Sequence, residues 1–84
     1  MTRGQIVRSL KGRDKGDFQV VLSCEGAFVT LCDGKRRSLE KPKKKKTFHV
    51  AATNSAVGEE RLKTNRQIRE ALRVYQGDAE TGGF

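Results

Sequence analysis

The segment from residue 4 to residue 22 reads GQIVRSLKGRDKGDFQVVL, in which two short apolar stretches flank a basic loop. The first stretch runs from Ile6 to Leu10, and the second, Phe18 to Leu22, is rich in β-branched residues. Both have the length and composition of β-strands. The segment therefore predicts two strands joined by a tight loop that contains Gly12 and Gly16.

The next stretch predicts a third and a fourth strand. Residues 27 to 32 place Ala27, Val29 and Leu31 on one face, as the period of two in a strand requires. Asp33-Gly34 follows, a pair favoured in two-residue hairpin turns because both residues tolerate a positive φ. We therefore expect a fourth strand over Lys35–Leu39.

Pro42 cannot donate a hydrogen bond to a neighbouring strand, so it is expected to end the fourth strand and to begin a loop that carries Lys43 to Lys46. Thr47 to Ala51 then has the character of a fifth strand. Five short strands with tight turns are too few for a sandwich. They predict a mainly β fold, a small closed barrel without free edges.

The C-terminal third differs in pattern. Thr64 is a candidate N-cap with Gln67 three positions later, and the apolar positions that follow recur at helical spacing: Ile68, Ala71, Leu72 and Tyr75. This predicts an amphipathic helix that ends at Gly77. Its stripe is expected to pack on the barrel, although a groove in a partner protein is the alternative. We divide the chain into a barrel over 1–52, a helical extension over 53–76 and a flexible tail over 77–84.

Charge is concentrated in the first part of the chain. The formal net charge is +8; residues 1 to 50 hold 13 Lys or Arg and 5 Asp or Glu, whereas residues 51 to 84 hold five of each kind. Residues 35 to 46 alone place eight cations and one anion in twelve positions. This density indicates a polyanionic partner, with a solvated loop that only aids solubility as the alternative. An anionic membrane surface fits the charge, but the chain lacks an apolar anchor.

Other classes of protein fit the sequence poorly. No apolar stretch is long enough to span a membrane and no signal peptide follows Met1, so a cytoplasmic protein is expected. Cys24 and Cys32 lie in or beside apolar strands and are expected to be reduced thiols. The single His49 and the two cysteines give at most three Cys and His side chains, at spacings that match no zinc finger or ribbon, so no metal and no cofactor are expected. No acid–base pair or nucleophile motif is present, and we expect no catalysis.

The segment from Gly4 to Leu22 resembles a KOW motif, and the resemblance extends through residues 33–37 and 42–46 to about residue 50. The chain is most similar to small stand-alone bacterial KOW-domain RNA-binding proteins, which are themselves similar to KOW-bearing large-subunit ribosomal proteins. The resemblance implies an SH3-like β-barrel that binds structured RNA through loops at one end. Residues 53 to 84 lie outside the motif.

The expected RNA-binding residues form two basic sets. Gly12 and Gly16 would bring backbone amides close to a phosphate, with cations around them at Lys11, Arg13 and Lys15. A second stretch of RNA backbone would meet Lys35, Arg36, Arg37, Lys43, Lys44, Lys45 and Lys46.

The predicted function is that of a non-catalytic, monomeric RNA-binding protein with a role in translation. Its expected partner is structured or ribosomal RNA, and the ribosome itself is a further candidate. Aromatic residues are few, and Phe18, Phe28 and Phe48 fall in strand patterns where core packing is common. Phosphate and shape recognition is therefore expected rather than base stacking. The alternative is a protein-interaction adaptor that uses the barrel or the C-terminal helix.

Overall fold

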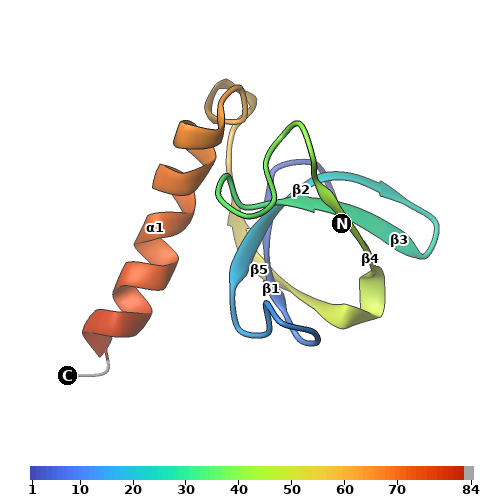
Figure 1. Ribbon diagram of the computed structural model, residues 1–84, viewed down its shortest axis with the longest axis horizontal. Helices are drawn as coiled ribbons and strands as arrows, with labels where there is room; N and C mark the ends of the chain where they lie inside the picture. Colours follow the sequence, from blue (N-terminus) through green and yellow to red (C-terminus); the bar gives the residue numbers. More distant parts are fainter. Residues whose placement is uncertain (83–84) are drawn as a thin grey trace.

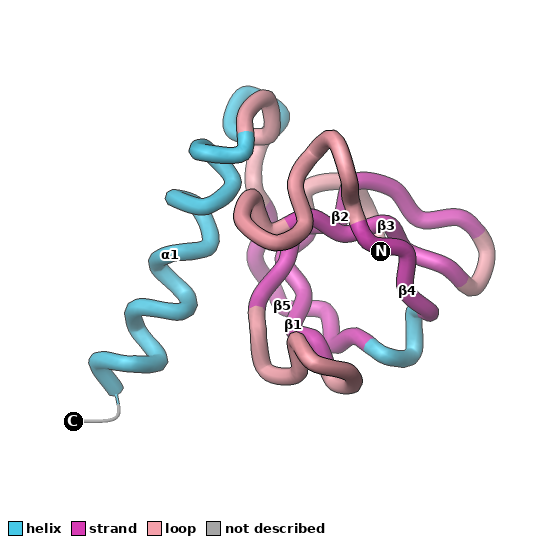
Figure 2. The backbone as a smooth tube through the Cα atoms, in the orientation of Figure 1, coloured by secondary structure: helices cyan, strands magenta, loops and turns pink. Residues whose placement is uncertain are grey.

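The computed structural model of the chain describes the backbone of residues 1 to 82 and the side chains of residues 1 to 75. Five antiparallel strands form one sheet in the order β4-β3-β2-β1-β5. The strands are β1 (Gln5–Ser9), β2 (Phe18–Glu25), β3 (Phe28–Cys32), β4 (Lys43–Lys46) and β5 (Val50–Ala56). Figures 1 and 2 show the sheet curling into a barrel-like ring, with helix α1 (Asn65–Gly82) outside it. The prediction of a mainly β fold with a C-terminal helix is confirmed. The prediction of a closed barrel without free edges is wrong, because β4 and β5 are the two ends of the sheet and do not pair with each other.

Apolar side chains form two cores, one on each face of the sheet. Adjacent residues point to opposite faces of a strand, so Ile6 and Val7 enter different cores. The inner core contains Val7, Val21, Val29, Leu31 and Val50. The outer core lies beneath the helix and contains Ile6, Val20, Cys32, Val57, Leu62, Ile68, Ala71 and Leu72. Apolar side chains are buried on both faces, which explains why the neighbours Ile6 and Val7 in β1, and Val20 and Val21 in β2, are all apolar. Across residues 1 to 82, no helix has the length and apolar character needed to cross a bilayer.

Helix α1 begins at the expected cap. Thr64 Oγ1 accepts a hydrogen bond from the Gln67 backbone N–H at 3.1 Å, and Gln67 Oε1 accepts one from the Thr64 N–H at 3.2 Å. This reciprocal arrangement is a capping box. Ile68 and Leu72 are buried in the outer core, and the rings of Tyr75 and Phe18 lie 5.5 Å apart. The prediction that the apolar stripe packs on the barrel is confirmed.

The predicted fourth strand over Lys35–Leu39 is wrong, because residues 33 to 42 form a loop and the strand is Lys43–Lys46. Asp33 Oδ1 accepts hydrogen bonds from the backbone N–H groups of Lys35 and Arg37, at 2.8 and 2.9 Å. The Arg37 carbonyl accepts the Asp33 N–H at 2.9 Å. These bonds fold the segment onto itself. Asp33-Gly34 therefore lies in a longer connection and is not a two-residue hairpin turn.

The last two elements differ from their predicted bounds. Thr47–His49 is a 3-10 turn, η1, and β5 continues to Ala56, past the predicted end of the barrel at residue 52. A second 3-10 turn, η2 (Glu59–Arg61), precedes the helix. Helix α1 continues through Gly77, since one glycine costs only about 1 kcal/mol in a helix and need not end it. Residues 77 to 82 of the predicted flexible tail are thus helical, and residues 83 and 84 lie outside the described part.

Truncating the helix stripe tests the outer core. Leu72→Ala is expected to lower the free energy of unfolding by about 2 to 5 kcal/mol, because it leaves a cavity between the helix and the sheet. Val74→Ala is the matched control on the same helix, since Val74 is 59% exposed, and should change stability by no more than about 0.5 kcal/mol. Urea unfolding measures both. Equal losses of free energy of unfolding in the two variants would contradict the burial of Leu72 between the helix and the sheet.

Candidate nucleic-acid interface

A buried ion pair lies where strand β4 meets the loop between β1 and β2. Lys45 Nζ donates to Asp14 Oδ1 at 2.7 Å, to Ser9 Oγ at 2.6 Å and to the Lys11 carbonyl at 2.7 Å. All three ammonium protons are thus satisfied. Lys45 is 8% exposed and Asp14 9%, so the pair is shielded from water. The prediction that Lys45 lies in an RNA-binding loop is wrong in its placement, because Lys45 lies in β4 and strand alternation turns it toward this carboxylate.

The surroundings of Asp14 keep its carboxyl group ionised. Ser9 Oγ donates to Oδ1 and Gln19 Nε2 donates to Oδ2, each at 2.8 Å. Burial raises the pKa of Asp14, but the hydrogen bonds from Lys45, Ser9 and Gln19, with the charge of Lys45, outweigh it and hold the pKa well below its ordinary value. Asp14 is therefore a fixed anion that orders the basic loop.

The glycine-framed loop has the tight conformation expected of it. Gly12 and Gly16 have φ angles of +97° and +92°, which favour glycine. However, the amides of Lys15, Gly16 and Asp17 donate to backbone carbonyls of β1 and the loop itself, at 3.2, 2.8 and 2.9 Å. These three amides are therefore not available to a phosphate, and the expectation of an amide cradle is wrong for them. The side chains of Lys11, Arg13 and Lys15 remain exposed.

Four of the expected cations line one pocket of about 190 Å³. Its walls come from the β1–β2 loop, from the start of β2, from the loop over residues 33–42 and from the start of β4. The lining residues are Arg13, Asp14, Gln19, Asp33, Arg36, Arg37 and Lys43. Among the described residues, the guanidinium groups of Arg13, Arg36 and Arg37 form no ion pair. One cation of the first predicted set and three of the second thus meet at one place, whereas Lys11, Lys15 and Lys35 do not line this pocket.

The acidic groups of this pocket already have partners in the protein. Asp14 is engaged by Lys45, and Lys43 Nζ lies a further 3.7 Å from its Oδ2. Asp33 Oδ1 caps backbone N–H groups of its own loop. Gln19 Oε1 is buried and has no hydrogen-bond partner within the described residues. The pocket therefore offers guanidinium groups and one unpaired acceptor; of its two carboxylates, Asp14 is paired with lysines and Asp33 is hydrogen-bonded to backbone N–H groups.

The loop over residues 33–42 is held in place by the start of the helix. Arg69 Nη1 donates to the Gly34 carbonyl at 2.9 Å, and Asn65 Oδ1 accepts the Leu39 N–H at 2.8 Å. A Cβ atom at Gly34 would lie only 2.4 Å from the Asn65 carbonyl oxygen, so the helix approaches the loop closely there. The helical extension, which lies outside the KOW-like segment, therefore positions Arg36 and Arg37.

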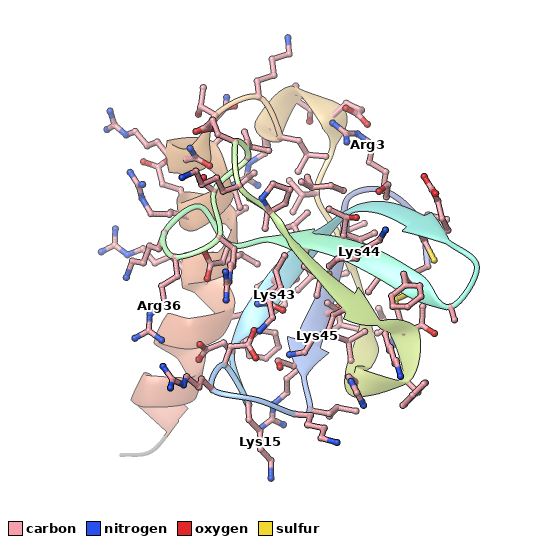
Figure 3. All side chains as sticks on the ribbon, turned by 45° about the vertical axis from the view of Figure 1, so that its right-hand side comes forward. Arg3, Lys15, Arg36, Lys43, Lys44 and Lys45 are labelled. Carbon is pink, nitrogen blue, oxygen red and sulfur yellow. The ribbon has the colours of Figure 1, made fainter. Side chains whose placement is uncertain are left out.

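The lysines of β4 alternate between two faces. Lys43 and Lys45 are the register partners of the inner-core residues Leu31 and Val29. Lys44 and Lys46 pair with Thr30 and Phe28 and point the other way, as Figure 3 shows for Lys44 against Lys43 and Lys45. The four lysines that were expected to act together therefore lie on two opposite faces of β4. Figure 3 also places Arg36 beside the helix and Lys15 at the far end of the β1–β2 loop.

The aromatic residues differ from expectation. Phe18 packs against the outer core, but Phe28 is 42% exposed and Phe48 is 67% exposed. Their expected place in the core is wrong: Phe28 points away from the inner core, and Phe48 lies in η1, which has no buried residue. The sequence alone did not distinguish the partly buried Phe18 from the exposed Phe28, because strand alternation does not show which face of the sheet the helix covers.

The remaining reactive side chains are few. Cys32 is buried in the outer core, where burial raises the pKa of its thiol, and Cys24 lies beside the inner core. Both cysteines are free, as expected. Partial burial and the nearby charges of Lys11, Lys46 and Lys45 lower the pKa of His49, which favours the neutral imidazole. Within the part of the chain that the structure describes, no three His, Cys, Asp or Glu residues are grouped as metal ligands would be.

Comparison with known proteins adds no family assignment: no protein-family model matches the chain, and no curated protein matches it.

Removing the Lys45 charge should destabilise the fold. Lys45→Met leaves the buried Asp14 carboxylate without its main partner, and we expect a loss of about 3 kcal/mol in the free energy of unfolding. Lys44→Met, on the exposed face of the same strand, should cost no more than about 0.5 kcal/mol. Chemical denaturation followed by circular dichroism measures both. Similar losses would show that Lys45 is not structurally special.

The Asp14 pKa predicts how stability depends on acid. Because this pKa is lower in the folded chain than in the unfolded chain, its contribution to stability is complete above the ordinary aspartate pKa of about 3.9 and is lost as pH falls below that value. The Asp14→Asn variant should have a lower free energy of unfolding than the wild type at neutral pH. Its free energy of unfolding should then fall less than that of the wild type as the pH is lowered below about 3.9. Urea unfolding at several pH values measures this. Parallel acid dependence in the two proteins would contradict the assignment.

Proposed function

We propose that the protein is a non-catalytic RNA-binding protein that contacts structured RNA mainly through phosphates. The observation that carries this proposal is the pocket in which Arg13, Arg36, Arg37 and Lys43 converge from three separate segments. Guanidinium groups bind phosphate in a planar, two-pronged geometry, so they suit an RNA backbone. The carboxylates of the pocket are held by Lys45 and by backbone amides, and oppose a bound phosphate less than free carboxylates would.

The resemblance to small bacterial KOW-domain proteins supports the same proposal, because its two basic segments are those that line the pocket. Under it, the protein is cytoplasmic, monomeric and related to translation, with ribosomal RNA as the leading ligand. The protein-interaction adaptor is less well supported. The apolar stripe of the helix, its simplest binding surface for a partner protein, is buried against the sheet.

Salt dependence tests whether phosphates dominate binding. If about four to six phosphate contacts form, the logarithm of the affinity for a structured RNA hairpin should fall with the logarithm of salt concentration at a slope of roughly −3 to −5. Binding to a protein partner through an apolar surface needs no such slope. Fluorescence anisotropy with a labelled hairpin measures it, and a slope near zero would contradict the proposal.

Two sets of three charges locate the site in the same assay. Replacing the three pocket arginines, Arg13, Arg36 and Arg37, with glutamine should weaken hairpin binding strongly. The matched control replaces three exposed cations away from the pocket: Arg61 in η2, Arg73 in α1, and Lys63 between these two elements. The control should weaken binding far less. Arg66 and Arg69 are unsuitable controls because they bond to Glu70 and to Gly34. Equal losses from the two sets would mean that binding follows total charge and that the pocket is not the site.

A further inference from the structure

A second surface, on the opposite face of β4 from the pocket, combines exposed aromatic rings with lysines. Phe28 begins β3 and pairs with Lys46, the last residue of β4, and Phe48 follows two residues later in η1. The backbone ties the two segments together, because the Thr47 N–H donates to the Ala27 carbonyl at 2.8 Å. We call Phe28, Lys44, Lys46, Phe48 and His49 the aromatic surface.

Each phenylalanine of the aromatic surface has a cation beside it. Lys44 Nζ lies 5.6 Å from the centroid of the Phe28 ring, and Lys46 Nζ lies 5.7 Å from that of Phe48. These are cation–π distances. The His49 ring meets Phe48 edge to face, with centroids 4.5 Å apart and an interplanar angle of 72°.

Nothing in the fold requires these rings to be exposed. Phe48 is the most exposed large apolar side chain among those of residues 1 to 75, and η1 buries none of its residues. Next to it, Leu10 is 46% exposed, and its N–H donates to the His49 carbonyl at 2.8 Å. Single apolar side chains are common on protein surfaces, but two phenylalanines within reach of lysines form a combined apolar and cationic surface.

The charge of the aromatic surface favours a polyanion. Lys44 and Lys46 belong to it, and Lys11 lies close enough to act on His49. The register of β2 and β3 places Glu25 opposite Phe28, so the surface also has one carboxylate at its border. Single-stranded nucleic acid matches such a surface, because its bases stack on aromatic rings while its phosphates meet the lysines. An acidic peptide would meet the lysines but has no equivalent set of flat bases.

We propose that the aromatic surface binds unpaired nucleotides of the RNA, with bases stacked on Phe48 and Phe28 and phosphates held by Lys44 and Lys46. This inference rests on the proposed RNA-binding function. Lys43 lines the phosphate pocket and Lys44 is its neighbour on β4, so the two sites adjoin across one strand. The protein would thereby select an RNA in which a loop or a single-stranded end lies next to a folded segment.

Two oligonucleotides with the same number of phosphates test the stacking directly. One is an oligoadenylate, and the other is an abasic strand of equal length, which keeps the phosphates and lacks the bases. The whole chain should bind the oligoadenylate more tightly, and Phe48→Ala should weaken that binding roughly fivefold or more while hardly affecting the abasic strand. Phe48→Trp retains a ring and should retain the difference. Val74→Ala, an exposed apolar residue on the helix, is the matched control.

The outcomes separate the two proposals. If Phe48→Ala and Phe28→Ala leave the oligoadenylate affinity unchanged, or if wild type binds the two strands equally, stacking is wrong while hairpin binding still supports the proposed function. If wild type binds neither strand nor a structured hairpin, the proposed function fails as well. If a polyglutamate peptide binds as tightly as the oligoadenylate and loses the same affinity in Phe48→Ala, the surface is a site for acidic peptides and the RNA assignment is overturned. Circular dichroism confirms that each variant is folded.

Discussion

The buried ion pair between Lys45 and Asp14 is the contact on which the rest of the site depends. Strand β4 consists of four lysines, pairs with β3 alone and forms one edge of the sheet. Residues of this kind have little tendency to form a strand by themselves. Lys45 supplies the missing constraint, because it reaches Asp14, Ser9 and the Lys11 carbonyl and so ties β4 to the β1–β2 loop. The same contact orders the loop that carries Arg13.

The sequence was sufficient to predict the elements that local patterns specify. The apolar, β-branched stretches of β1 and β2, the alternation in β3 and the capping box at Thr64 depend on residues close together in the chain, and the structure confirms them. Strand β4 and the loop over residues 33–42 were misassigned because their partners are distant. Asp14 holds β4, and Asn65 and Arg69 on the helix hold the loop. Local composition cannot reveal either contact.

The sequence was sufficient to predict which segments carry the cations of the candidate site, but not how their side chains are arranged. Charge density correctly singled out the segments that meet in the pocket, including Arg13 and Arg36. It could not show that Lys45 is buried or that Lys44 faces the other way, because a run of identical residues carries no alternating pattern. Phe28 was missed because the face of a strand that is covered depends on where the helix packs, and Phe48 was missed because Thr47–His49 forms a 3-10 turn and not the expected strand.

The proposed function requires that the basic end of the barrel, and not the general charge of the chain, recognises RNA. Chemical shifts of the backbone amides in the whole protein, followed by NMR as a structured RNA hairpin with a single-stranded end is added, test it most directly. The account predicts that the largest changes occur at residues 11–15, 33–37 and 43–49, with little change at residues 58–64. Largest changes at residues 58–64 or along the outer face of α1 would contradict it.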